Sequence, residues 1–357
     1  VVEKPRWVVP VIVVAAALAL VLGFAGGQLT VPEPEPPSAI HATLLPPPGT
    51  EIQLDVGSHL AISPDGSRVV FAARDTTGTV TLWVRRLDSS AAYVLSGTED
   101  ATYPFWSPDS RKVGFFANGR LKKIDATGGV ATAICDAANG RGGAWFEDDR
   151  VIFAPGPRDS LHIVASTGGT PVAITEVDTL SWSHRWPAIL PGTDKFIYVS
   201  GGRRDQLHWR SIDSDADHKV LLTEVSRAAF ADGHLFFGRD GALWARPFDP
   251  PTGEFLGEEV LVAEAVVTSP NFVSGAYSVA WNGTLVYAAG TETSTAVIVV
   301  LDGDGIEVDR LEFENSSTQD PNLSPDGRYL AYAAWPSDGD SPPDVWIRDL
   351  ERGSNSR

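Results

Sequence analysis

Two patterns of hydrophobic residues divide the chain. Residues 7–24 are almost wholly apolar, and no charged residue occurs between Trp7 and Pro32. From Thr50 onward, apolar residues come in short runs rich in Val, Phe, Tyr and Trp, separated by Gly, Pro, Asp and Asn; examples are RVVFAAR, KVGFFA, KFIYVSG and TLVYAAG. No long stretch of this second part keeps the 3.6-residue period of an amphipathic helix. The pattern predicts an all-β domain over residues 50–357.

The apolar N-terminal run predicts a transmembrane helix over residues 7–27, because eighteen or more such residues span the hydrocarbon layer. Lys4 and Arg6 precede the run, and the next basic residue is Arg68. The positive-inside rule therefore places residues 1–6 in the cytoplasm and all later residues outside it. A signal peptide is the alternative, but the run is long for one and GFAGG is a poor cleavage site. We expect a single-pass protein of the cell membrane.

A linker is predicted between the helix and the β domain, over residues 28–49. Seven prolines fall between Val31 and Gly49, a composition typical of an extended spacer that builds no core. The chain begins with Val and contains no Met. We therefore expect it to be part of a longer gene product.

One phrase recurs along the β domain, followed by a strand-like run each time. Its clearest copies are Ser63-Pro64-Asp65-Gly66, Ser107-Pro108-Asp109-Ser110 and Ser324-Pro325-Asp326-Gly327. Weaker copies occur in AWFEDDRVIFA, ILPGTDKFIYV, AFADGHLFFG and AWNGTLVYA, giving seven at spacings of roughly 39 to 50 residues. Pro presets φ for a turn, Asp accepts hydrogen bonds from the backbone ahead, and Gly takes positive φ. Each copy predicts a tight antiparallel hairpin.

Two further strands follow each hairpin, as in VTLWVRRLD and AAYVLSG. Four strands in each repeat of this length predict a β-propeller of about seven four-stranded blades. The repeated turn residues are accordingly interpreted as architecture rather than as copies of an active site. The segment TEIQLDV at residues 50–56 is a spare strand that could complete the last blade and close the ring. The alternative is that the domain continues past Arg357.

Charge and composition exclude several classes of function. The chain has 28 Lys and Arg against 46 Asp and Glu, a net charge of −18. Such a surface repels nucleic acid and anionic lipid headgroups. The single cysteine, Cys135, excludes an internal disulfide framework and is interpreted as a small buried hydrophobe. No cofactor is predicted.

No metal site and no catalytic residue are predicted. The seven histidines lack metal-ligand spacing. The acidic clusters Asp213-Asp215-Asp217 and Asp302-Asp304 suggest calcium, but neither continues into a complete loop, so solvated turns are favoured. Gly-x-Ser-x-Gly, His-Glu-x-x-His and Walker motifs are absent from the sequence.

The phrase SHRWP contains the candidate ligand-binding residues His184, Arg185 and Trp186. These three could bind a carbohydrate or peptide ring by stacking and hydrogen bonding. The favoured alternative is that Trp186 packs between blades while His184 and Arg185 bond to neighbouring loops. Trp106, Trp145, Trp182 and Trp281 lie near the repeated turns and are interpreted as wedges between blades.

The hairpin phrases resemble the TolB-like, WD-type propeller repeats of bacterial envelope proteins. The phrases GTEDATYPFWSPDSRKVGFFANGRLKKIDATGG, RGGAWFEDDRVIFAPG, HRWPAILPGTDKFIYV and DGALWARPFDPPTGE are similar to the extracytoplasmic propeller of bacterial transmembrane serine/threonine protein kinases. The resemblance covers the helix, the linker and most of residues 50–350. It implies that a cytoplasmic kinase domain precedes the membrane helix. The Gly-rich, His-Arg-Asp and Asp-Phe-Gly segments of such a domain do not occur in these 357 residues.

The function predicted from the sequence is that of a membrane-anchored sensor or binding module for a protein, peptide or cell-envelope ligand. A homodimer would be the simplest way to pass a signal through one helix. Two alternatives stay open: the substrate-gating propeller of a membrane serine peptidase, and a non-enzymatic envelope scaffold.

Overall fold

A computed structural model describes residues 43–53, 59–202, 204–214, 216–269, 273–290, 296–301, 307–313, 318–334 and 344–357. All regular elements in these ranges are β-strands, which confirms the all-β prediction. None of the described residues belongs to a helix of the length and apolarity that a membrane crossing needs. Residues 1–6, which were predicted to be cytoplasmic, the predicted membrane helix and residues 28–42 of the predicted linker lie outside the described residues.

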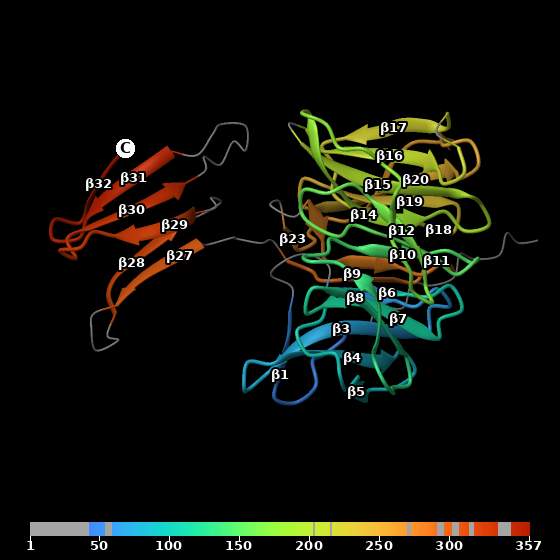
Figure 1. Cartoon of the computed structure of the whole chain (residues 1–357), viewed down its shortest axis with the longest axis horizontal. Coiled ribbons are helices and arrows are strands. Elements are labelled where there is room, and N and C mark those ends of the chain that lie inside the picture. Colours follow the sequence, from blue (N-terminus) through green and yellow to red (C-terminus); the bar gives the residue numbers. More distant parts are fainter. Residues whose placement is uncertain are drawn as a thin grey trace, which may run out of the picture. The chain divides into compact units, whose positions relative to one another are not determined.

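Five antiparallel sheets follow one another along the chain and match the predicted repeats (Figure 1). The first blade has β1 (Thr50–Ile52), β2 (Leu60–Ile62), β3 (Arg68–Asp75), β4 (Val80–Arg86) and β5 (Ala92–Val94). The second has β6 (Thr102–Trp106), β7 (Lys112–Ala117), β8 (Arg120–Asp125) and β9 (Thr132–Asp136). The third has β10 (Gly143–Trp145), β11 (Arg150–Phe153), β12 (His162–Ala165) and β13 (Val172–Ala173). All pairings in these blades are antiparallel, and consecutive strands pair except in the first blade, where β1 and β2 both pair with β3.

The fourth blade has β14 (Ser181–Ile189), β15 (Lys195–Gly202), β16 (Gln206–Ser211) and β17 (His218–Thr223). The fifth has β18 (Ala228–Ala231), β19 (His234–Arg239), β20 (Ala242–Asp249), β21 (Glu254–Phe255) and β22 (Val260–Ala263). A sixth unit follows, with two separate hairpins: β23 (Thr268–Ser269) with β24 (Ser274–Gly275), and β25 (Tyr277–Val279) with β26 (Leu285–Tyr287).

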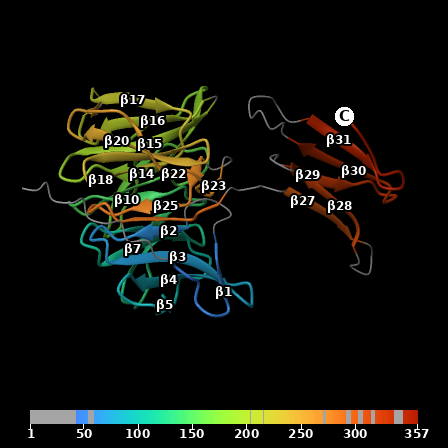
Figure 2. The ribbon, with the colours of Figure 1, turned by 180° about the vertical axis from the view of Figure 1, so that it is seen from behind.

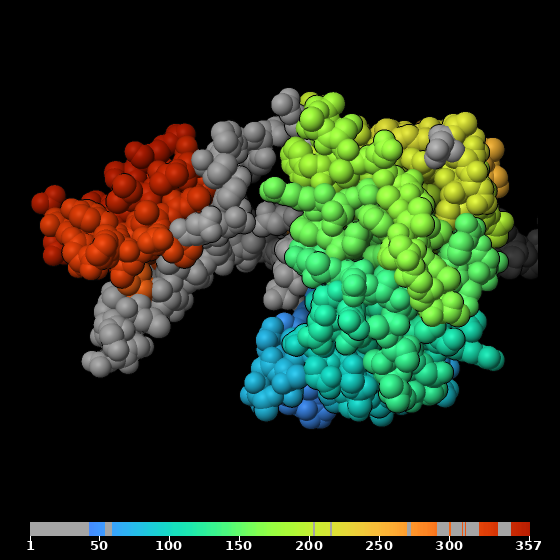
Figure 3. Space-filling view, in the orientation of Figure 1, coloured from blue at the N-terminus to red at the C-terminus, as the bar shows by residue number. Residues whose placement is uncertain are grey.

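The first strands of the repeats form a closed ring. Contacts run from β2 to β6, β10, β14, β18 and β25 in turn, and β25 contacts β2 again. At this closure the Ile62 amide donates to Ser278 Oγ over 3.1 Å, and the Trp281 amide donates to the Pro64 carbonyl over 3.1 Å. Sheets arranged around such a ring make a β-propeller. Adjacent blades pack side by side in the views from both sides and in the space-filling view (Figures 1, 2 and 3).

Blade-to-blade packing explains why the strands are so apolar. The middle strands β3, β7 and β15 are buried along most of their length, because each blade has a neighbour on both faces. One core cluster joins the first and second blades, and another joins the third and fourth through Phe146, Ile152, Phe196 and Tyr198. Burying a Phe or Leu side chain contributes about 1.5–3 kcal/mol. These clusters therefore hold the ring together.

Among the described strands, six first strands complete the ring, whereas seven blades were predicted. The seventh repeat turn joins β29 (Thr318–Leu323) to β30 (Tyr329–Ala334) in a sheet with β31 (Asp344–Asp349) and β32 (Ser354–Ser356). Its core packs with β27 (Ala296–Leu301) and β28 (Glu307–Phe313). The ion pair between Arg348 and Asp309, 2.8 Å from Nε to Oδ2, joins the same two sheets. Because β25 contacts β2, the first strand β29 of the seventh repeat is not part of the described ring of first strands.

The predicted use of residues 50–56 to complete the last blade is wrong. β1 pairs antiparallel with β3 of the first blade, with Thr50 opposite Asp75 and Ile52 opposite Ala73. β2 covers only the other half of the eight-residue β3, from Val69 to Phe71. β1 therefore satisfies backbone groups that β2 is too short to reach.

The three clearest repeat turns have the same geometry. In each, the Ser hydroxyl donates to the Asp carboxylate two residues later: Ser63 to Asp65 over 2.5 Å, Ser107 to Asp109 over 2.6 Å and Ser324 to Asp326 over 2.5 Å. The same Asp accepts from the backbone amide two residues further on. The fourth position has positive φ in all three: Gly66 at 72°, Ser110 at 59° and Gly327 at 72°. Pro64, Pro108 and Pro325 hold the second position.

Candidate ligand-binding site

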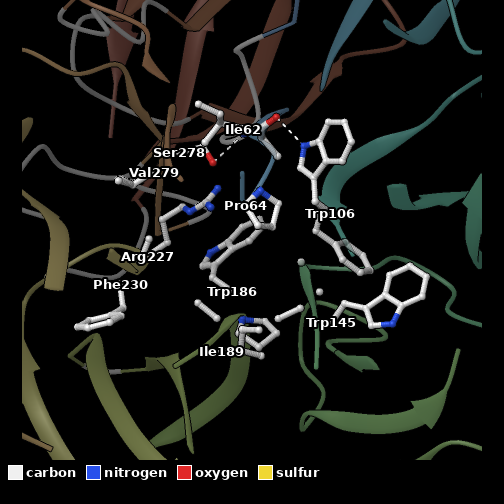
Figure 4. A pocket seen from close by; sticks show the side chains of 18 of the residues that line it. Ile62, Pro64, Trp106, Trp145, Trp186, Ile189, Arg227, Phe230, Ser278 and Val279 are labelled. Carbon is white, nitrogen blue, oxygen red and sulfur yellow. Dashed lines mark hydrogen bonds between the residues drawn. The ribbon is translucent and has the colours of Figure 1, made fainter. Parts of the chain in front are cut away.

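A small pocket lined mainly by apolar residues lies where the six first strands meet (Figure 4). We call it the central pocket. Its volume is about 150 Å³, and residues from β2, β6, β10, β14, β18 and β25 line it. Its lining is rich in aromatic side chains: Tyr103, Phe105, Trp106, Trp145, Trp186, Phe230 and Trp281. Aromatic rings of this kind bind apolar and planar groups of a ligand.

A backbone irregularity places Trp186 in the central pocket. The register between β14 and β15 shifts between Arg185 and Ala188, and Trp186 has a φ of 54° immediately before Pro187. Left-handed backbone at a non-glycine residue is strained, and such strain occurs often at binding sites. Tyr103 shares this feature, with a φ of 49° before Pro104 and a register shift in β6. Both bulges turn an aromatic side chain towards the pocket.

Among the described residues that line the central pocket, Arg227 is the only charged one. It directly precedes β18, and its guanidinium Cζ lies 5.6 Å from the ring centroid of Tyr277, in cation–π geometry. Burial lowers the pKa of Arg227, and the nearby Tyr277 opposes this shift. An arginine stays protonated in proteins at neutral pH, so the pocket carries a positive charge.

His184 does not reach the central pocket. It lines a lateral groove of about 920 Å³ beside the third and fourth blades, together with Tyr198, His208 and His218. His184 Nδ1 lies 2.8 Å from Thr175 Oγ1, and its Nε2 lies 3.1 Å from Ser181 Oγ. These contacts with the preceding loop and strand agree with the packing interpretation of SHRWP.

The lateral groove contains a row of histidines. His208 Nδ1 lies 2.9 Å from His218 Nε2, and His208 Nε2 lies 2.8 Å from Ser200 Oγ. The ring of His208 stacks on the rings of Tyr198 and His218. Burial lowers the pKa of His184 to about 4, with Asp178 opposing the shift, and burial together with His218 and His184 lowers the pKa of His208 to about 4. Both rings are neutral at pH 7.

Arg185 is buried on the other face of β14. Its exposed fraction is 7%, and its Nε donates to Ser183 Oγ over 2.8 Å. Burial lowers the pKa of Arg185, an effect that Asp205 opposes, and burial raises the pKa of Asp205. The register shift of β14 between Arg185 and Ala188 interrupts the alternation of the strand and separates the three candidate residues. Trp186 alone lines the central pocket.

The other tryptophans differ in their environments. Trp106 Nε1 donates to the Ala61 carbonyl over 2.9 Å and so bridges the second and first blades, as a wedge should. Trp145 is buried but bonds within its own blade, donating to Asp149 over 3.0 Å. Trp182 is 44% exposed, so its assignment as a wedge is wrong.

The remaining candidates from the sequence have structural partners or lie outside the described residues. Asp217 pairs with Lys195 at 2.7 Å, and Asp213 lies 3.5 Å from Arg150. Asp215 and the pair Asp302 and Asp304 are outside the described ranges. Among described residues, no group of three or more His, Cys, Asp or Glu side chains is arranged to hold a metal ion. Burial raises the pKa of Cys135 to about 11, which keeps its thiol protonated at neutral pH.

Tyr103, Arg227 and Ser278 are pocket residues that the sequence analysis missed. Each lies in or directly before the first strand of a repeat, and these first strands line the central pocket. Aligning the repeats by their turns would have identified these positions. Such an alignment would not single out Arg227 as a binding residue, because what distinguishes Arg227 is the lack of acidic residues beside it in space.

No protein-family model matches the chain, and a comparison with curated proteins gives no match. Several solved structures are similar in shape. One is a chain of a nidogen/laminin complex, with 13% identity, a TM-score of 0.46, and coverage of 57% of this chain and 79% of the other. The Cps50 (Swd1) β-propeller domain of Myceliophteria thermophila has 14% identity and a TM-score of 0.40, covering 86% and 88%.

A putative TolB from Agrobacterium tumefaciens is also similar, with 15% identity, a TM-score of 0.38, and coverage of 74% of this chain and 83% of the other. At such low identity and TM-scores, these likenesses say nothing about what this chain binds. The relationship to receptor kinases stays a prediction from the sequence phrases.

Proposed function

We propose that this chain is a ligand-binding sensor module, which binds a short peptide segment in the central pocket of its propeller. One observation carries the proposal: an aromatic-lined pocket at the meeting point of all six first strands, with a single guanidinium in its lining. Apolar pockets with a few convergent polar groups are typical of binding sites. The proposal assigns no chemistry to the chain, whose sequence carries no catalytic motif.

The proposed location is outside the cytoplasm, tethered by a membrane helix. The support is the uncharged apolar run of residues 7–27, the basic residues Lys4 and Arg6 before it, and the proline-rich segment after it. The phrases shared with bacterial serine/threonine kinases support a kinase domain on the cytoplasmic side, to which ligand binding would be coupled through the helix.

Binding is tested with the full chain in lipid nanodiscs and a panel of short synthetic peptides with varied last residues, each in a free-acid and a carboxamide form. Tryptophan fluorescence reports occupancy of the pocket. We expect some peptides to bind the parent chain, and Trp186→Ala to weaken this binding at least tenfold. Trp182→Ala, which removes an exposed indole of the same strand, is the matched control. No binding by any peptide, or equal binding by the Trp186→Ala chain, would overturn the proposed function.

Topology is tested by fusing alkaline phosphatase, which is active only outside the cytoplasm, to the C-terminus of the chain in a bacterial host. We expect phosphatase activity from the full chain and none after deletion of residues 7–27.

The kinase connection is tested on the DNA upstream of Val1. An open frame encoding Gly-rich, His-Arg-Asp and Asp-Phe-Gly segments is expected, and a start codon directly upstream would contradict it.

A further inference from the structure

The guanidinium of Arg227 differs from those of several other described arginines, which have acceptors within the protein. Arg150 and Arg348 pair with carboxylates, whereas Arg74 and Arg246 donate to an amide or backbone oxygen. Within the described part of the chain, the guanidinium of Arg227 forms no ion pair and no hydrogen bond. It makes a cation–π contact with the ring of Tyr277 instead. The acidic residues outnumber the basic ones by 46 to 28. The missing partner therefore reflects the position of Arg227 and not a shortage of carboxylates.

The central pocket has no negative charge of its own to offer Arg227. The described residues of its lining include no Asp and no Glu, and most of them are aromatic or aliphatic. A charged group in such a setting is costly unless it is paired and hydrogen-bonded. A guanidinium presents its donors in a planar fork that matches the two oxygens of a carboxylate. The environment of Arg227 thus favours an anion that enters from solution.

Ser278 supplies a second hydrogen-bond donor near this charge. Its Oγ accepts the Ile62 amide over 3.1 Å, which leaves the hydroxyl proton free to donate. Arg227 directly precedes β18, Ser278 lies in the neighbouring first strand β25, and both residues line the pocket (Figure 4). One guanidinium and one hydroxyl suit the single charge of a carboxylate better than the double charge of a phosphate.

The size of the pocket limits what accompanies the carboxylate. Its volume of about 150 Å³ is below the range of about 300–1,000 Å³ typical of small-molecule sites. It has room for the end of a chain and not for a folded surface or a large cofactor. Trp106, Trp145 and Trp186 provide apolar walls for one side chain next to the carboxylate.

We propose that the central pocket recognises the C-terminal carboxylate of a peptide that ends in an apolar or aromatic residue, with Arg227 and Ser278 binding the carboxylate. This inference rests on the proposed function and names its ligand class. The negative charge of the protein keeps other acidic segments at a distance, while the local guanidinium selects the terminus.

The test uses three probes with the full chain in nanodiscs: acetyl-Ala-Ala-Phe as the free acid, the same peptide as its carboxamide, and acetyl-Ala-Glu-Phe carboxamide. The third probe carries its carboxylate on a side chain. We expect the free acid to bind at least about tenfold more tightly than either carboxamide, since a charge-assisted bidentate hydrogen bond is lost in both. Equal affinity of the first two probes overturns the inference. Tighter binding of the third probe also overturns it and assigns the site to side-chain carboxylates.

Two variants assign the preference to Arg227. Arg227→Met keeps the length of the side chain without its charge, and it should reduce the preference for the acid over the carboxamide to less than twofold. Arg204→Met, an exposed arginine on the lateral groove, is the control and should keep the full preference. A preference that survives in the Arg227→Met chain contradicts the assignment. The ratio of the parent chain's affinities for the free-acid peptide and its carboxamide tests the inference even if the Arg227→Met variant does not fold.

The panel separates the two proposals. If no peptide in either form binds, the proposed function itself fails. If peptides bind in a Trp186-dependent way but the two forms bind equally, the proposed function stands and the carboxylate inference fails.

Discussion

The indole of Trp186 lies edge-on against the phenol ring of Tyr103, with ring centroids 5.0 Å apart and planes at 71°. The two residues belong to the fourth and second blades, and the third blade lies between these in the ring. They meet because the third blade presents Gly142 at this point: a Cβ there would lie 2.7 Å from Trp186 Cε3. One missing side chain thus allows two bulged strands to form a wall of the central pocket.

Substituting Gly142→Ala should lower the free energy of unfolding by about 2–4 kcal/mol. The new methyl group would overlap the Trp186 ring, and the backbone φ of 89° disfavours any residue with a Cβ. Chemical denaturation of the full chain in detergent measures the effect. Gly119→Ala is the matched control, because Gly119 has a φ of 72° with no atom within 4 Å of the added Cβ. Its loss should be about 1 kcal/mol, and equal losses would contradict the role of Gly142.

Substituting Asp109→Ala should destabilise the second blade by about 1–2 kcal/mol. The carboxylate accepts from Ser107 Oγ over 2.6 Å and from the Arg111 amide over 3.1 Å, and both bonds are lost. Glu147→Ala removes an exposed carboxylate from a neighbouring repeat turn and should change stability by less than 0.5 kcal/mol, roughly the limit for surface substitutions. Peptide binding should be the same in both variants. A loss of binding with unchanged stability would mean that the repeated turn is a site after all.

Substituting Ser278→Ala should weaken the closure of the ring. The Ile62 amide loses its acceptor at a buried position, which costs about 1–3 kcal/mol. Hydrogen exchange at the Ile62 amide should accelerate by one to two orders of magnitude, as this energy implies at roughly 1.4 kcal/mol for each factor of ten. Ser90→Ala, at an exposed serine of the first blade, should leave that rate unchanged. An unaltered rate in the Ser278→Ala chain would show that the closure does not depend on this bond.

Stability should fall as the pH decreases from about 6.5 to about 4. Burial lowers the folded-state pKa of His184 and of His208 to about 4, while the unfolded chain takes up these protons near pH 6.5. The unfolded state therefore binds more protons in this window, and each histidine contributes a slope of up to about 1.4 kcal/mol per pH unit. Below pH 4 both states are protonated and the slope of these groups vanishes.

The substitution His208→Asn should remove the contribution of one histidine, roughly half of the two-histidine effect, from the slope of unfolding free energy against pH. Denaturation midpoints at a series of pH values measure it, and NMR titration of the imidazole protons in the folded chain checks the pKa directly. The groups that face these rings are Tyr198, Asp178, Arg210 and His218. A folded-state pKa near 6.5 for His208, or an unchanged slope in the variant, would contradict the buried neutral state.

Local features were predictable from the sequence alone. Apolar runs of β-branched and aromatic residues gave the strands, and Ser-Pro-Asp-Gly gave the turns, because a hairpin is specified by residues a few positions apart. The repetition of these units gave the propeller class. The three turns at Ser63, Ser107 and Ser324 have nearly identical hydrogen bonds, as their shared Ser-Pro-Asp sequence predicts.

Tertiary structure alone decided the closure of the ring and the composition of the pocket. The spacing of the repeats does not record that β25 contacts β2, since this depends on hydrogen bonds such as Ile62 to Ser278 between residues 216 positions apart. The residue pattern of SHRWP does not predict the bulge that separates His184 from Trp186. Nor does the sequence show that no described carboxylate lines the pocket beside Arg227, because charge pairing is a property of neighbours in space.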